Sequence, residues 1–257
     1  MKNMKLILKF VFIFSIIYIG YSIIIVKPKS VKSIIFEEKA MDNHYEISKE
    51  NEKKVIYLTF DDGPSYLVTE RILDILKENG VKATFFVVGS QIKDREKTLR
   101  RIFDEGHSIG LHTYSHKYNK IYSSQENFIE EMRKTSDEIN SVIGISPTII
   151  RFPAGSKKRL NDSFLEKLHK ENYKVFDWNA SISDGINPNL DAEKLYRNAI
   201  KIKNKHLVIL LMHSNADNKK TCEALPRIIE YYKAEKYEFK IISSETPEFY
   251  FRYKILK

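Results

Sequence analysis

From Val55 onward the chain alternates between short apolar runs and longer runs with apolar residues three and four apart. The first pattern predicts strands and the second predicts amphipathic helices. Strands that alternate with helices of ten or more residues imply βαβ units and a parallel sheet covered by helices. The predicted strands are 55–60, 83–88, 108–112, 148–152, 174–178, 207–212 and 240–243. The predicted helices are 67–79, 94–105, 124–143, 162–171, 191–203 and 219–235.

This alternation predicts an α/β fold with one core. About seven units follow one another along the chain, which favours a distorted, incomplete (β/α)7-type barrel. A doubly wound open sheet is the alternative. A chain of 257 residues is short enough for either to be a single domain. Gly80 is suited to ending the first helix and Asp191 to capping the start of a later one.

The N-terminal segment predicts a membrane anchor. Residues 10–26 are uncharged and rich in Ile and Phe, and Lys2, Lys5 and Lys9 precede them. With residues 6–8 the run approaches the roughly 20 residues that span a bilayer. No small-x-small cleavage site follows it, so an uncleaved signal anchor is favoured over a signal peptide. We therefore expect an anchor at 1–27, a linker at 28–52, a folded extracytoplasmic domain at 53–250 and a tail at 251–257.

Charge and cysteine content narrow the choice of partners. The net charge is +9, but the lysines are dispersed and no Arg-rich or aromatic RNA-binding motif occurs. We therefore expect no nucleic-acid partner, and we expect a monomer. An anionic lipid surface or an anionic cell wall fits the charge, as does a solvated surface without a specific partner. Cys222 is the only cysteine, so it forms no internal disulfide and is interpreted as structural.

Chemically distinctive residues gather at the predicted strand ends. In a parallel barrel these ends meet at the catalytic face, so five such clusters favour an active site there. The residues are Asp61, Asp62, His112, His116, Arg151, Asp184 and His213.

The Asp61-Asp62 pair is costly unless a function separates the two charges, because adjacent carboxylates repel each other. His112 and His116 are four apart, and on a helical turn they would share a face. Two imidazoles and one carboxylate with open positions are typical of catalytic zinc sites and also suit Fe(II) or Co(II).

Two other candidates are ambiguous when considered alone. The segment around Arg151 favours a surface Arg before a turn, although an Arg there could also orient a carboxylate. A single His at the end of an apolar strand, such as His213, is usually structural. At the mouth of a barrel beside a metal, a catalytic role is favoured instead.

In its motifs the chain resembles the polysaccharide deacetylases of carbohydrate esterase family 4, which share the NodB homology domain. The resemblance covers roughly residues 54–244. The ordered motifs are TFDDGP at 59–64, H-T-Y-S-H at 112–116, R-F-P at 151–153, a Trp/Asp segment at 178–184 and L-M-H at 211–213. Five motifs in the family's order make a chance match improbable.

The resemblance implies a role for each matching residue. One divalent metal ion would be bound by Asp62, His112 and His116. Zinc is the first expectation, with cobalt, nickel, iron or manganese as alternatives. Asp61 would be the general base, held by Arg151, and His213 the general acid, paired with Asp184. The acetyl group would be bound by the Ala154 backbone N–H, Leu211 and Trp178.

Two departures from the family pattern affect these roles. Ala154 replaces a common Tyr, and Gly185 falls where a Trp is usual if the fourth motif is aligned from Trp178. A second alignment makes Asp177-Trp178 the end of that motif. The alternative to a substrate role is that Trp178 is an aromatic residue of the hydrophobic core.

The resemblance implies metal-dependent removal of acetyl groups from a cell-wall glycan, with peptidoglycan N-acetylglucosamine as the first expectation. Chitooligosaccharide, poly-N-acetylglucosamine and acetylxylan are alternative substrates. Two further hypotheses are a membrane-anchored glycan-binding domain without catalysis and a hydrolase of small amides.

Overall fold

A computed structural model describes residues 53–202 and 206–251 of the chain. The predicted anchor at 1–27, the linker at 28–52 and nearly all of the predicted tail lie outside these ranges. Among the described helices, none combines the length and the apolar character that a bilayer span requires.

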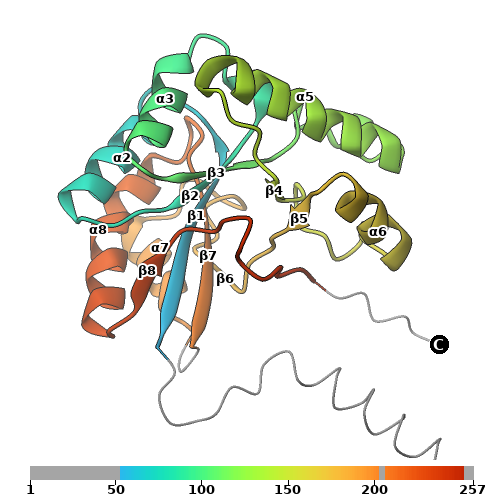
Figure 1. Ribbon diagram of the computed structural model, residues 1–257. Coiled ribbons are helices and arrows are strands. Elements are labelled where there is room, and N and C mark those ends of the chain that lie inside the picture. Colours follow the sequence, from blue (N-terminus) through green and yellow to red (C-terminus); the bar gives the residue numbers. More distant parts are fainter. Residues whose placement is uncertain (1–52, 203–205, 252–257) are drawn as a thin grey trace, which may run out of the picture. The chain divides into compact units, whose positions relative to one another are not determined.

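The strands form one parallel sheet that curls into an incomplete barrel (Figure 1). Their order is β5-β4-β3-β2-β1-β7-β6, with β8 beside the first residues of β1. Strands that are consecutive in the chain are therefore neighbours in the sheet from β1 to β5 and from β6 to β7, and β1 pairs with the late strands β7 and β8. No ladder among the described residues joins β5 to β6. This is the order of a barrel opened at one point, and it excludes the doubly wound alternative. The strands are β1 (Val55–Gly63), β2 (Thr84–Val87), β3 (Ser108–Leu111), β4 (Ile149–Ile150), β5 (Lys174–Val175), β6 (Ala180–Ser181), β7 (Leu207–His213) and β8 (Glu238–Lys240).

Helices cover the outer face of this sheet (Figure 1). They are α2 (Val68–Glu78), α3 (Glu96–Asp104), α5 (Gln125–Ile143), α6 (Asp162–Lys170), α7 (Ala192–Ala199) and α8 (Lys219–Ala234). Two short helices, η1 (Gly89–Gln91) and α4 (Tyr118–Ile121), lie in the connections after β2 and β3. The two predicted helix signals are confirmed. Gly80 has a φ of +64° just after α2, and Asp191 accepts a hydrogen bond from the Lys194 N–H at 2.7 Å at the start of α7.

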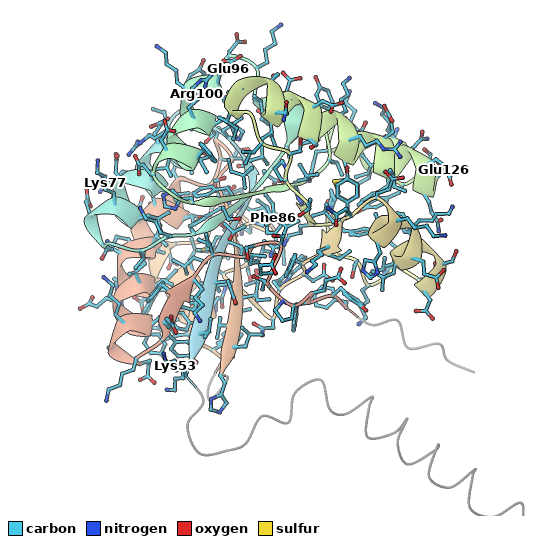
Figure 2. The ribbon with its side chains drawn as sticks, in the orientation of Figure 1. Lys53, Lys77, Phe86, Glu96, Arg100 and Glu126 are labelled. Carbon is cyan, nitrogen blue, oxygen red and sulfur yellow. The ribbon has the colours of Figure 1, made fainter. Side chains whose placement is uncertain are left out.

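Alternate strand residues face two separate apolar layers, as the period of two in a strand requires. Phe85 and Val87 of β2 belong to the large core beneath the helices. Phe86, between them, lies in a smaller cluster inside the barrel with Phe176 and Ile209. Figure 2 shows Phe86 deep in the molecule, whereas labelled side chains such as Glu96 and Arg100 project outward. The barrel interior is thus a packed core.

Four elements differ from the sequence prediction. The last strand occupies Glu238–Lys240 and not 240–243, because β2 replaces β8 as the neighbour of β1 from Thr59 onward. Beyond that point the Ile242 N–H donates to the Thr84 hydroxyl at 2.9 Å. The two-residue strand β6, the one-turn helix α4 and the three-residue helix η1 were not predicted, because none of them is long enough to show a periodic pattern.

Candidate active site

The Asp61-Asp62 pair lies at the end of β1, where the backbone separates the two carboxylates. Asp61 is still in register with His213 of β7, but the pairing with β2 shifts between Asp61 and Gly63. Asp62 has a φ of +69°, in the left-handed region. This local irregularity allows adjacent aspartates to contact different partners, which reduces the repulsion that the sequence suggests.

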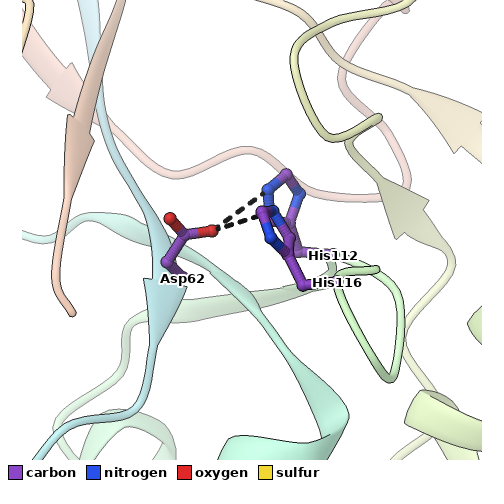
Figure 3. A group of neighbouring side chains, drawn as sticks. All are labelled: Asp62, His112 and His116. Atoms are coloured by element: carbon purple, nitrogen blue, oxygen red, sulfur yellow. Dashed lines mark ion pairs between the residues drawn. The ribbon is translucent and has the colours of Figure 1, made fainter. Parts of the chain in front are cut away.

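Asp62, His112 and His116 converge into one cluster (Figure 3). Asp62 Oδ1 lies 3.4 Å from His112 Nε2 and 3.3 Å from His116 Nε2. One ligand atom from each residue lies within 4.8 Å of the other two. Asp62 Oδ1 is buried without a hydrogen-bond partner, which is costly for a carboxylate oxygen unless a cation completes the site. The cluster therefore fits a metal ion.

The expectation that both histidines lie on one helical turn is wrong. His112 follows β3, and residues 112–116 form a loop in which Thr113 and His116 have φ values of +65° and +53°. The loop bends back on itself, so the two rings lie 5.1 Å apart between centroids without helical geometry. The i, i+4 spacing thus identified the pair, while the backbone conformation that brings them together differs from the prediction.

The protonation of both imidazoles suits metal binding. His112 Nδ1 lies 2.9 Å from the Arg151 carbonyl, an acceptor, so this nitrogen donates and Nε2 presents its lone pair to the cluster. Burial and the nearby His112 ring lower the pKa of His116, which keeps that imidazole neutral. Burial raises the pKa of Asp62, but the two histidines outweigh this and hold it well below its usual range. Two imidazole nitrogens and one carboxylate oxygen form a typical donor set for catalytic zinc.

Arg151 is fully buried and reaches Asp61 from β4's end. Its Nη1 donates to Asp61 Oδ1 at 2.9 Å and to the Thr59 hydroxyl at 2.8 Å. Nε donates to the Phe176 carbonyl at 2.8 Å and Nη2 to the Asp177 carbonyl at 3.1 Å. The interpretation of Arg151 as a surface residue is therefore wrong. Its contacts fix the orientation of the Asp61 carboxylate and compensate its charge.

His213 and the buried Asp184 form a second pair. Asp184 Oδ1 lies 2.9 Å from His213 Nδ1, and its Oδ2 accepts from the His213 N–H at 2.8 Å and the Thr221 hydroxyl at 2.7 Å. Burial lowers the pKa of His213, but the Asp184 carboxylate outweighs it and raises that pKa to about 9. His213 is therefore protonated at neutral pH, and its Nε2 can donate a proton.

The contacts of Asp177 and Asp184 distinguish the two alignments of the fourth motif. Asp177 is buried against Ser156 and the Phe251 N–H and does not pair with His213. The alignment that starts at Trp178 therefore identifies the carboxylate that does pair with His213, which is Asp184. A Cβ at Gly185 would lie 2.2 Å from His213 Cε1. No side chain fits there while the ring keeps its place, which accounts for glycine in this chain.

The three predicted acetyl-binding residues lie in different surroundings. Ala154 is exposed, with a φ of +61°, in the turn after β4. Leu211 is 6% exposed, two residues before His213 in β7. Trp178 is half-buried, 5.8 Å from the Arg151 guanidinium and edge-on to Phe251 at 5.3 Å. Trp178 therefore packs as part of the barrel interior beside Arg151.

Sequence reasoning missed three supporting residues. Asn215 Nδ2 lies 3.4 Å from Asp62 Oδ2, and Thr221 holds Asp184 as described. Glu131 is 3% exposed and accepts the Tyr114 and Ser115 N–H groups at 3.1 and 2.6 Å. An available signal was the place of Glu131 on the apolar face of its helix, beside Phe128 and Met132. An acidic residue at a core-facing position is buried only when it is paired.

Comparisons with known proteins agree with this geometry. The polysaccharide deacetylase family profile matches residues 48–176. A peptidoglycan-N-acetylglucosamine deacetylase of Bacillus cereus is 33% identical over 199 residues, which are 76% of this chain and 71% of that protein.

Solved structures give the same result. The crystal structure of a polysaccharide deacetylase from Bacillus cereus aligns with a TM-score of 0.70 at 32% identity, over 76% of this chain and 95% of that one. The catalytic domain of a peptidoglycan N-acetylglucosamine deacetylase from Eubacterium rectale aligns with a TM-score of 0.71 at 28% identity, over 80% and 96%.

Proposed function

This chain belongs to the polysaccharide deacetylase family, and from that premise we propose that it hydrolyses the acetamido group of N-acetylglucosamine in peptidoglycan and releases acetate. It is an enzyme, a hydrolase of the same class as its relatives. The observation that carries the proposal is the gathering of an Asp61–Arg151 pair and a His213–Asp184 pair around one cluster of metal-ligating residues.

We propose that Asp62, His112 and His116 hold one divalent cation, with zinc as the first choice and cobalt, nickel, iron or manganese as alternatives. When bound, such an ion polarises an amide carbonyl and lowers the pKa of water toward about 7. The unpartnered Asp62 oxygen and the lowered pKa of His116 support this assignment.

The remaining residues supply proton transfer. Asp61 takes a proton from the attacking water while the water oxygen forms a bond to the acetyl carbon. Arg151 holds Asp61 Oδ1, which leaves Oδ2 to receive that proton. His213 gives its Nε2 proton to the amide nitrogen as the C–N bond breaks, so the sugar leaves as a neutral amine. A positioned acid of this kind contributes about 10²–10⁴-fold in rate.

The acetyl group would lie between Ala154 and Leu211. In this arrangement the Ala154 N–H donates to the developing oxyanion, and Leu211 contacts the acetyl methyl. Replacement of the family's usual Tyr by Ala removes a ring but keeps the backbone donor, so oxyanion stabilisation survives the departure.

The choice of peptidoglycan rests on the names of the relatives and on the predicted location. We propose that residues 1–27 anchor the protein in the cell membrane and that the catalytic domain lies outside the cytoplasm. There it acts as a monomer on the adjacent wall.

Acetate release from defined glycans tests the function. The full chain is purified in detergent with zinc and incubated with peptidoglycan, N-acetylglucosamine oligosaccharides and acetylxylan. We expect release from peptidoglycan, with a loss of at least 10²-fold in Asp61→Asn. Asp104→Asn, at an exposed position at the end of α3, is the matched control and should retain activity. Equal activities of wild type and Asp61→Asn on every substrate would refute the proposal.

A further inference from the structure

A hollow opens beside the metal-ligating cluster and extends away from it. Its volume is about 670 Å³, within the usual range for small-ligand sites. Asp62 and His116 form one wall. The opposite walls come from the turn after β1, from η1 and the residues after it, and from the loop before α8. A ligand in this hollow would therefore be continuous with a substrate at the catalytic residues.

Tyr66 presents an aromatic ring to this hollow. Tyr66 is 57% exposed, so its ring is accessible to a ligand in the hollow. The ring is nevertheless fixed. Its hydroxyl donates to the Asp94 carbonyl, and the Arg95 guanidinium lies 5.0 Å from the ring centroid. A ring held at its hydroxyl and supported by a cation loses little entropy when a ligand covers it.

Arg95 is itself held in place by the backbone. Its Nη1 donates to the Gln91 carbonyl at 3.1 Å and the Lys93 carbonyl at 3.3 Å. Because these bonds fix the guanidinium, Tyr66 rests on a rigid support. The hollow also carries polar groups suited to hydroxyls, including Ser90, Gln91 and Asn215.

This combination matches the chemistry of a pyranose ring. The C–H groups on one side of a sugar ring carry partial positive charge, which the negative face of an aromatic ring attracts. The sugar's hydroxyl groups then need polar neighbours at the rim. Rigid aromatic residues surrounded by polar groups are efficient binding elements because few rotamers are frozen on binding.

We propose that Tyr66 forms a subsite for a second sugar of the glycan strand, one that neighbours the N-acetylglucosamine being deacetylated. This inference rests on the proposed function and adds a specificity-determining residue to it. The ring binds the glycan equally before and during the reaction, so it acts on KM and not on kcat.

Steady-state kinetics on a defined oligosaccharide of the glycan that wild type uses best tests the subsite. We expect Tyr66→Ala to raise KM about tenfold with kcat within twofold, a change of about 1.4 kcal/mol in binding. Tyr66→Phe keeps the ring and should stay within about threefold of wild type, while Tyr66→Leu keeps apolar cover without a ring and should resemble Tyr66→Ala. Phe103→Ala, at a 40% exposed position on α3, is the matched control.

Three results would overturn the subsite. An unchanged KM in Tyr66→Ala would show that the ring does not touch substrate. A fall in kcat at constant KM would show that the substitution disturbs the catalytic groups. A KM of Tyr66→Leu equal to that of Tyr66→Phe would show that the site requires an apolar side chain of this size and no aromatic ring. If wild type releases no acetate from any glycan, the proposed function fails instead, so the two failures are distinguishable.

Discussion

Glu131 provides the sharpest test of how the fold supports the cluster of metal-ligating residues. This residue of α5 is 3% exposed, and its Oε2 accepts the N–H groups of Tyr114 and Ser115, between the two histidines. Lys120 Nζ lies 2.7 Å from its Oε1. Thr113 and His116 are both in the left-handed region, where a β-branched residue such as Thr113 is especially unfavourable. The carboxylate therefore offsets a strain of about 1–3 kcal/mol per residue.

The cost of removing Glu131 follows from these contacts. Each of the two hydrogen bonds to the charged acceptor contributes about 1.5–3 kcal/mol, so Glu131→Ala should lower the free energy of unfolding by about 3–6 kcal/mol. The Lys120 pair adds little because the Lys side chain is 58% exposed. Glu131→Gln keeps an oxygen acceptor and should lose about 1–2 kcal/mol. A loop released from this anchor should bind zinc about 10–100-fold more weakly.

Urea unfolding and competition with a chromophoric zinc chelator measure both quantities. Asp137→Ala, at an exposed position of the same helix, is the matched control and should change neither. The order of zinc affinities should be wild type, Glu131→Gln, Glu131→Ala. An unchanged zinc affinity in Glu131→Ala, together with a stability loss below about 1 kcal/mol, would refute the reasoning.

Three further predictions address the acid, the pH dependence and the metal. Gly185→Ala places a methyl group 2.2 Å from His213 Cε1, so we expect kcat for acetate release to fall about 10²-fold or more, with a thermal midpoint close to wild type. Burial and the Lys82 charge lower the pKa of His107 to about 4. In the unfolded state this pKa is near 6.5, so between pH 4 and 6.5 the unfolded chain binds more protons than the folded one. The free energy of unfolding should therefore fall by about 3 kcal/mol as the pH drops through this window. Urea titrations of His107→Gln should show a weaker dependence of the free energy of unfolding on pH. Removal of the metal by a chelator should abolish acetate release, and added zinc should restore it. In urea titrations, zinc at about 1,000 times its Kd should raise the free energy of unfolding of wild type by about 4 kcal/mol. The free energy of unfolding of Asp62→Ala should not change with zinc.

The sequence contained enough information to predict the fold class and the candidate site, because several strands, among them β1, β3 and β7, end in or beside an Asp or His. Asp62, His112 and His116 converge as their spacing and position at strand ends indicated. What a sequence does not display is backbone geometry at the turn. The left-handed residue Asp62 and the non-helical loop that carries both histidines depend on contacts formed only in the fold. Glu131 and Tyr66 were overlooked because neither lies in a motif.

Arg151 has a second task beside holding Asp61. The carbonyls of Phe176 and Asp177, which follow β5, are buried with these residues. Arg151 donates to both carbonyls, at 2.8 and 3.1 Å.

On the same segment, the Asp177 N–H is bonded to the Phe249 carbonyl, and Phe249 N–H returns to Val175 at 3.2 Å. The buried guanidinium therefore satisfies two backbone carbonyls and the Asp61 carboxylate at once. Removing it would leave a buried carboxylate and two buried carbonyls unpaired, at a cost of about 3–5 kcal/mol for the charge pair alone. Substitutions of Arg151 thus confound activity with folding. Asp61→Asn also breaks the charge pair, but it leaves the carbonyl contacts in place and keeps an oxygen acceptor for Arg151, so its activity is measured together with its free energy of unfolding.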